Sequence, residues 1–363
     1  MNRRFFSLAS GLLPFCAVTL VQFFPSLSHA AEGGADLAAI KQYLVQKAHV
    51  MDGAAHDFAK RAADYAAIIK KYDGDYNAAA KAESATLLPL IVEMQNDYRV
   101  YHNNGYEAIE GITAGVRRFV EYDNYLDAGV PKSEASTDSP ASALVLKTAE
   151  GKTIVNQQGN LFHYVIEPML WGTTEQFIKR LDSEASTAAK GVKALPRAEV
   201  VLAASKELVA QLDTLSAKSE AWQPTLDECV GALVWMTPTL NGYFDDWRDS
   251  RYNPTRGLTR YVAQSRVIDM RGIMGSLQLT YNAVLPALSQ KDPALAKQIA
   301  ANYKKIMDFI AGIETREKKG KISVLEIEEL SYQAKALTDQ LGPELKQAVA
   351  LLDVKLPRKP ILI

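Results

Sequence analysis

His163 and Glu167 lie four residues apart near the middle of the chain, within a largely apolar segment. On a helix this spacing places both side chains on one face, where an imidazole nitrogen and a carboxylate can together hold a divalent or ferric ion. Pro168 follows directly and removes a backbone hydrogen bond, so we expect the helix to kink or a new helix to begin there. A His/Glu pair at this spacing is more often a surface hydrogen bond, and the kink beside it in an apolar stretch favours a functional site modestly.

A second set of acidic residues lies upstream and is interleaved with Tyr and Ile. Glu107 and Glu110 are three residues apart, and Asp123 and Asp127 are four apart, so each pair shares one helical face. The pattern indicates a partly buried acidic pocket, and buried carboxylates require a cation. Either a metal ion or the arginines at 117–118 could supply that positive charge, and a solvated acidic surface is the alternative.

Three more residues with metal-binding side chains, His49, Asp52 and His56, occupy positions i, i+3 and i+7. They share one stripe of a helix, which indicates a second metal-binding face or a solvated polar surface, and we favour the surface. His102 lies just before the acidic residues, and we expect it near the site rather than in it.

Six arginines between residues 248 and 271 form the other charged cluster. Guanidinium groups at this density can bind an acidic polysaccharide or another anion. The same segment carries aspartates at positions 245, 246, 249 and 269 as internal partners, so we favour an ion-pair network.

The composition is that of a folded protein with balanced charge. The 363 residues include 41 Lys+Arg against 42 Asp+Glu, and 48% are hydrophobic. These values exclude a disordered tail and a highly basic nucleic-acid binder, so we expect no nucleic-acid partner.

Residues 1–30 have the pattern of a secretory signal peptide. Arginines at 3 and 4 provide the positive start, residues 5–24 carry no charge, and Ser28-His29-Ala30 offers small residues before a cleavage point. We therefore expect cleavage after Ala30 and a periplasmic mature protein. No later run of about eighteen uncharged apolar residues occurs, so we expect no transmembrane helix in the mature chain.

Apolar residues at three- and four-residue spacing predict that most of the mature chain is helical. We expect helices over residues 36–72, about 84–120 and about 159–181, with four or five more between 196 and 353. Capping boxes, formed by Thr225 with Glu228 and by Ser323 with Glu326, mark two of the later helix starts. The predicted class is all-α.

Residues 130–158 lack the helical period and carry Pro, Ser, Thr and Gly. Inside them, residues 143–146 and 152–155 flank Glu150-Gly151, which predicts a small hairpin ornament near 140–158. Small residues gather again at 185–196. We therefore expect an N-terminal helical bundle over 31–190 and a C-terminal helical bundle over 191–363.

Several of these segments resemble motifs of one family. Tyr106-Glu-Ala-Ile-Glu110 resembles the acidic helix motif of imelysin-like proteins, in particular the EfeO/EfeM branch of periplasmic iron-uptake components. The stretch from Phe162 to Trp171 is similar to that family's Gly-x-His-x-x-Glu motif, which runs into Leu-Trp. Leu226-Asp-Glu-Cys-Val230 resembles its later Leu-Asp-Glu-Val segment, and the order of the pieces matches over nearly all of the mature chain.

The resemblance implies two up-down helical bundles that together form one bilobed imelysin-like module with a cleft between them. It implies a metal site built from the central His and Glu and from carboxylates of other helices. The candidate ligands are Glu107, Glu110, Asp127, His163, Glu167 and Glu228, with Asp123 as the alternative to Asp127.

Two features of the sequence bear on these candidates. Three residues separate His163 from Glu167, where the family has two. Either the helix carries an extra residue, such as a bulge linked to Pro168, or His163 lies outside the site and Tyr164 occupies its position. Glu228 has a second explanation, since it closes the capping box of Thr225.

The resulting hypothesis is a periplasmic protein that captures iron, or another divalent or trivalent transition metal, in a carboxylate- and His-lined interbundle cleft for uptake. An inner-membrane iron permease would be its partner. Two alternatives stay open: a periplasmic binding or sensor module for a peptide or an acidic polysaccharide, and a metallopeptidase. No Gly-x-Ser-x-Gly, Gly-rich phosphate loop or His-Glu-x-x-His motif occurs, so we expect no enzyme activity.

Overall fold

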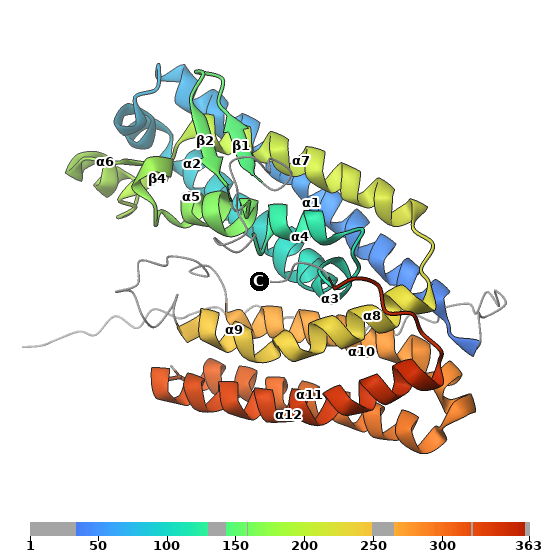
Figure 1. The fold of residues 1–363 in the computed structure, drawn as a ribbon. Helices are drawn as coiled ribbons and strands as arrows, with labels where there is room; N and C mark the ends of the chain where they lie inside the picture. The colour runs from blue at the N-terminus through green and yellow to red at the C-terminus, as the bar shows by residue number, and fades with distance from the viewer. Residues whose placement is uncertain (1–33, 130–142, 158, 249–264, 321, 360–363) are drawn as a thin grey trace, which may run out of the picture. The chain divides into compact units, whose positions relative to one another are not determined.

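Long helices make up most of the chain in the computed structural model, which confirms the predicted all-α class (Figure 1). The structure describes residues 34–129, 143–157, 159–248, 265–320 and 322–359. The predicted signal peptide lies outside these residues. Among the described residues, no helix is both long and apolar enough to cross a membrane.

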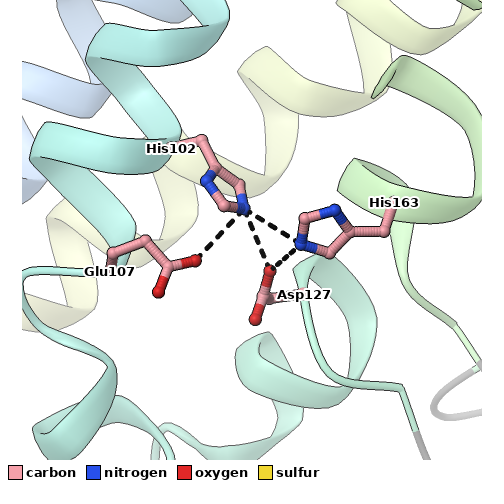
Figure 2. A group of neighbouring side chains, drawn as sticks. All are labelled: His102, Glu107, Asp127 and His163. Carbon is pink, nitrogen blue, oxygen red and sulfur yellow. Dashed lines mark hydrogen bonds and ion pairs between the residues drawn. The ribbon is translucent and has the colours of Figure 1, made fainter. Parts of the chain in front are cut away.

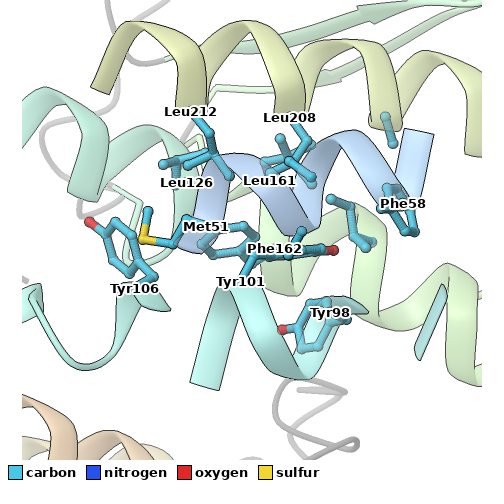
Figure 3. Close-up of a cluster of buried hydrophobic side chains, with 14 of the residues drawn as sticks. Met51, Phe58, Tyr98, Tyr101, Tyr106, Leu126, Leu161, Phe162, Leu208 and Leu212 are labelled. Atoms are coloured by element: carbon cyan, nitrogen blue, oxygen red, sulfur yellow. The ribbon is translucent and has the colours of Figure 1, made fainter. Parts of the chain in front are cut away.

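Helices α1 (Leu37–Lys71), α2 (Tyr76–Tyr98) and α7 (Ala198–Ala221) pack around the first buried cluster. Asp36 begins α1 by accepting a hydrogen bond from the Ala39 N–H. Figure 1 shows α7 running alongside α1. Figure 3 shows large side chains of this cluster, among them Met51, Phe58, Tyr98, Tyr101, Phe162, Leu208 and Leu212.

The remaining long helices enclose a second buried cluster. They are α8 (Leu226–Met236), α9 (Leu240–Trp247), α10 (Arg266–Lys291), α11 (Pro293–Lys319) and α12 (Val324–Leu351). Both predicted capping boxes are present at the starts of α8 and α12. The division of the chain near residue 190 stays a prediction, and the packing of α7 places that helix with the first cluster.

Short elements replace two of the long helices that we expected. The predicted helix over 84–120 is α2 followed by a π-helix, η2 (Arg99–Tyr106), and a short helix, α3 (Glu110–Thr113). Helix α4 (Val120–Leu126) follows. The prediction missed these breaks because apolar spacing does not distinguish a π-helical turn or a short turn between helices from a continuous α-helix.

The expected helix over 159–181 ends early. It consists of a π-helix, η4 (Phe162–Ile166), and helix α5 (Glu167–Trp171), which stops at Gly172 in the left-handed conformation. Pro168 lies in the first turn of α5, where its missing N–H costs nothing, so a new helix does begin at this point as expected.

Two small antiparallel hairpins decorate the helices. Strands β1 (Leu144–Lys147) and β2 (Thr153–Asn156) confirm the predicted hairpin within one residue. Strands β3 (Ile178–Arg180) and β4 (Ala194–Pro196) form a second hairpin that the sequence did not reveal, and α6 (Ser183–Ala188) lies between them.

A close helix contact brings α10 against the acidic segment. A Cβ atom at Gly272 would lie 2.5 Å from the carbonyl oxygen of Glu107 and 2.7 Å from its carbonyl carbon. Only a glycine lets the backbone of α10 approach Glu107 this closely. Gly272 therefore fixes the distance between the C-terminal helices and the residues of the candidate site.

We predict that Gly272→Ala destabilises the protein by about 1–3 kcal/mol, the usual cost of forcing a methyl group into a packed contact. Gly275→Ala is the matched control, because its methyl group would meet nothing closer than Met307 Cε at 3.8 Å. Urea unfolding of the two variants measures the difference. Equal stability of the two would show that the close contact at Gly272 is not needed.

Candidate metal centre

Four residues with metal-binding side chains converge in the interior (Figure 2). His102 lies in η2, Glu107 ends it, Asp127 ends α4, and His163 lies in η4. One ligand atom from each lies within 4.8 Å of the others, and every one of the four side chains is buried. The structure thus brings together three predicted site residues and one, His102, that we had placed outside.

The two imidazole rings point at the same carboxylate. Nε2 of His102 lies 3.1 Å from Asp127 Oδ1, and Nε2 of His163 lies 2.9 Å from the same oxygen. The two Nε2 atoms are 3.2 Å apart, and His102 Nε2 is 3.2 Å from Glu107 Oε1. Imidazole nitrogens and carboxylate oxygens are usual ligands of transition-metal ions, so these four side chains could hold such an ion.

A π-helical turn places His163 in the site. Helix η4 closes its backbone hydrogen bond from Glu167 N–H to Phe162 C=O, five residues back, so it holds one residue more than an α-helical turn. The extra residue that separates His163 from Glu167 is therefore absorbed as a bulge. Tyr164, which would replace His163 in the stricter register, is 37% exposed and packs its ring against Phe177.

A second π-helix aligns His102 with Glu107. The Glu107 N–H donates to the His102 C=O at 3.0 Å, again across five residues. In an α-helix, residues five apart would point about 140° away from each other. The wider π-helical turn brings their side chains to one side, and π-helical turns of this kind occur often at functional sites.

Each histidine is oriented through its other ring nitrogen. His163 Nδ1 lies 2.5 Å from Glu167 Oε2, and His102 Nδ1 lies 3.1 Å from Asn103 Oδ1. This arrangement is typical of metal-bound histidines, whose distal N–H is held by a carboxylate or amide. We had predicted Glu167 as a direct ligand, and that role stays a prediction; its contact with Nδ1 also allows it to orient the His163 ring.

Aromatic rings fix the plane of His102. The Tyr98 ring stacks on its imidazole with the ring centroids 4.9 Å apart, and the Phe162 ring meets the imidazole edge-on, also with the centroids 4.9 Å apart.

Asn160 starts the helix that carries His163, because its Oδ1 accepts from the His163 N–H at 2.8 Å. These contacts hold both imidazoles before any ligand binds.

The cluster is short of positive charge. Neither carboxylate oxygen of Glu107 accepts a hydrogen bond from any residue that the structure describes, although the side chain is fully buried. Its contact with His102 Nε2 at 3.2 Å is an ion pair only if the imidazole is protonated, and a buried carboxylate that accepts no hydrogen bond is strongly unfavourable. The two Glu107 oxygens lie in the same group as two imidazole nitrogens, and their lone pairs can coordinate a cation. The residues present therefore suit a bound metal.

The pKa values of the cluster reflect the same deficit. Burial lowers the pKa of His163, but the carboxylates of Asp127 and Glu167 outweigh it and raise the value to about 9. Burial raises the pKa of Asp127, yet the two histidines hold it below its usual range. Burial, Asp269 and Asp127 raise the pKa of Glu107 well above normal. Without metal, a proton on His163 supplies part of the missing charge.

A second acidic group adjoins the first. One oxygen each of Glu110, Asp123 and Asp127 lies within 4.8 Å of the other two, and all three side chains are buried. Tyr243 donates to Glu110 Oε1 at 2.9 Å, and Tyr106 donates to Asp123 Oδ1 at 2.9 Å. Asp123 and Asp127, which we had treated as alternatives, therefore belong to the same constellation.

Glu228 has a different set of contacts. It closes the capping box at Thr225, accepts from the Trp222 indole at 3.1 Å and pairs with Arg118 at 2.7 Å. It belongs to neither convergent group. The structure thus supports its capping role, and Glu228 as a ligand stays a prediction that these contacts do not favour.

The other charged constellations lie elsewhere. His56 faces Asp52 and Asp213 at 3.5 and 3.8 Å on the exposed surface of α1 and α7, and His49 pairs with Glu220. Of the six arginines, those at 248, 266 and 271 pair with acids, as expected for an ion-pair network. The arginines at 251, 256 and 260 lie outside the described residues.

The fold and the site together define a helical protein with a buried group of His and carboxylate side chains that could hold a metal ion. The family model of the imelysins, Peptidase_M75, matches residues 106–343, well over half of the chain. The chain therefore belongs to the imelysin family. A search of curated proteins finds none that matches it.

Sequence reasoning missed His102 for a structural reason. The residue has no acidic neighbour at helical spacing, and its alignment with Glu107 depends on a π-helical hydrogen bond that no local pattern announces. The flanking Gly105 was the available signal. A Cβ atom there would lie 2.2 Å from Met51 Cγ, so this turn must pack tightly against α1.

We predict that Glu167→Gln weakens metal binding about 10- to 100-fold, the usual effect of losing a carboxylate that orients a ligating histidine. Competition with a chromophoric chelator measures the change. Glu175→Gln is the control, because Glu175 is an exposed partner of Arg180. Unchanged affinity in Glu167→Gln would refute the positioning role.

We predict that metal affinity rises with pH. Protons on His163, whose pKa is about 9, and on Glu107, whose pKa is raised, must leave before metal binds. Below about pH 9 each released proton strengthens binding about tenfold per pH unit. Titrations at about pH 6 and about pH 8 test the sign. Stronger binding at the lower pH would contradict this view of the site.

Proposed function

We propose that this imelysin-family protein captures iron or a similar transition-metal ion, as an EfeO/EfeM-type component of metal uptake. The observation that carries the proposal is the meeting of two imidazole Nε2 atoms, 3.2 Å apart, with buried carboxylates of Asp127 and Glu107. Protons or a cation must balance such a group. The distal nitrogens are already held as they are in metal sites.

The donor set favours a transition metal over calcium or magnesium. Calcium and magnesium select oxygen ligands, whereas imidazole suits iron, zinc and copper. Two histidines with one or two carboxylates are the donor set of many non-haem iron sites. Iron is therefore our first candidate for the ion.

The place and partner of the protein are proposals from its sequence. The charged start and apolar stretch of residues 1–30 support export, and a periplasmic protein of this type would pass its ion to an inner-membrane permease. Fractionation of cells that express the full chain tests this placement. The mature protein should be recovered from the periplasm without residues 1–30.

The geometry favours capture over peptide hydrolysis. The family model carries the name Peptidase_M75, which suggests peptide hydrolysis. A metallopeptidase needs an open metal position that a peptide can reach. His102, Glu107, Asp127 and His163 are all at most 2% exposed. An ion needs a far narrower path to such a group than a polypeptide does, so we propose no enzyme activity.

One observation supports binding of a non-metal ligand as a second candidate function. A cavity of about 460 Å³ lies between α2, α5 and the second hairpin, within the usual size range of small-molecule sites. Its walls are mainly apolar and include Ile91, Leu170 and Trp171. This lining suits an apolar group, such as a peptide side chain, better than an acidic polysaccharide.

We predict that His102→Ala and His163→Ala each lower metal affinity at least about 100-fold, because each removes one of the two imidazole ligands. His49→Ala is the matched control, since His49 lies on the exposed surface with Glu220. Elemental analysis and titration of purified mature protein with ferrous iron measure the effect. Full binding by both site variants, or no binding by the unmodified protein, would refute the proposal.

A further inference from the structure

We propose that the buried site holds two cations side by side, bridged by the carboxylate of Asp127. The first position is formed by His102, Glu107 and His163 with Asp127. The second is formed by Glu110 and Asp123 with Asp127. This inference rests on the proposed function, since it concerns the number and arrangement of the captured ions.

The two positions share one residue. Asp127 is a member of both convergent groups, and its Oδ1 already faces the two histidines at 3.1 and 2.9 Å. A carboxylate has two oxygens, so Asp127 can contribute one to each cation. Carboxylate-bridged pairs of metal ions in proteins lie about 3.5–4 Å apart.

Glu110 points to a ligand at the second position. The side chain is only 2% exposed, and its Oε1 accepts from Tyr243. Its Oε2 is buried and accepts no hydrogen bond from any described residue. A buried carboxylate oxygen of this kind, beside the carboxylates of Asp123 and Asp127, requires a proton or a cation to be tolerated, and a cation can serve all three carboxylates at once.

Tyrosines hold the two new ligands in place without neutralising them. The hydroxyl of Tyr243 holds Glu110, and the hydroxyl of Tyr106 holds Asp123. A phenol is a neutral donor and therefore supplies no positive charge to either carboxylate. The contacts therefore orient the acids as outer partners orient metal ligands.

The charge of the whole group supports two ions. Arg266 pairs with Asp269 and lies close enough to Glu107, Glu110 and Asp123 to act on their charges, and both histidines contact Asp127. With the six acids ionised and both histidines neutral, one divalent ion together with Arg266 balances three of the acids, and two ions balance five. The buried acids are Glu107, Glu110, Asp123, Asp127, Glu167 and Asp269.

The two positions have different chemical preferences. The first offers two imidazoles and suits transition metals such as iron. The second offers only carboxylate oxygens, which suit harder ions such as Mn²⁺ or Mg²⁺. We infer that the first position fills before the second, because it alone combines imidazole with carboxylate.

Equilibrium dialysis of the mature protein, residues 31–363, against Mn²⁺ tests the inference. We expect two equivalents for the unmodified protein and one for Glu110→Gln and Asp123→Asn. Glu121→Gln is the matched control, because Glu121 lies two residues before Asp123 and pairs with Lys218 at the surface. Melting curves identify any variant that fails to fold. The inference requires that Glu110→Gln and Asp123→Asn both bind one equivalent of Mn²⁺.

Electron paramagnetic resonance distinguishes a bridged pair from two separate ions. We expect spin coupling between the two Mn²⁺ ions in the unmodified protein and an uncoupled single-ion spectrum in Glu110→Gln. Two equivalents without coupling would overturn the bridge.

The stoichiometry also separates this inference from the function on which it rests. One equivalent that His163→Ala abolishes and Glu110→Gln leaves intact would overturn the second position while retaining the capture site. Absence of metal binding in the unmodified protein would overturn both.

Discussion

Two imidazole nitrogens face each other at 3.2 Å across a buried carboxylate, and the group around them has more acceptors than protons. In water these groups would be solvated, but here the side chains of His102, Asp127 and His163 are almost completely buried. Such an arrangement persists only if a proton or a metal ion supplies positive charge. The surrounding helices, aromatic rings and hydrogen bonds hold these side chains together.

Two π-helical turns within the α-helical scaffold hold the histidines in this arrangement. The π-helical turns η2 and η4 each carry one of the histidines, and each directs its side chain toward Asp127 at the end of α4. Hydrophobic packing supplies the rigidity, because Phe162 contacts the rings of both Tyr101 and His102. The tertiary packing thus stabilises local backbone geometry that would be unfavourable in an isolated helix.

Local patterns in the sequence account for much of the fold. Apolar spacing predicted α1 almost to its ends, and the capping boxes predicted the starts of α8 and α12, because both signals act within one or two turns of the chain. The short hairpin β1–β2 was predictable for the same reason. The hairpin β3–β4 was not, since its strands are three residues each and lie far apart in sequence.

The sequence predicted which types of residue would form the site, but it did not predict every individual residue. Acidic spacing identified Glu107, Glu110 and Asp127, yet it could not show that Glu228 is used elsewhere. The inclusion of His102 depends on a five-residue backbone hydrogen bond that only the folded chain reveals. Residue types and intervals therefore indicated a cation site, while the three-dimensional contacts decided which side chains form it.

The central claim is that a captured ion is bound by both histidines. X-ray absorption spectroscopy of mature protein loaded with one equivalent of iron measures the ligands directly. The account predicts two imidazole rings in the coordination shell, together with carboxylate oxygens. An iron centre surrounded by oxygen atoms alone, with no imidazole scattering, would contradict it.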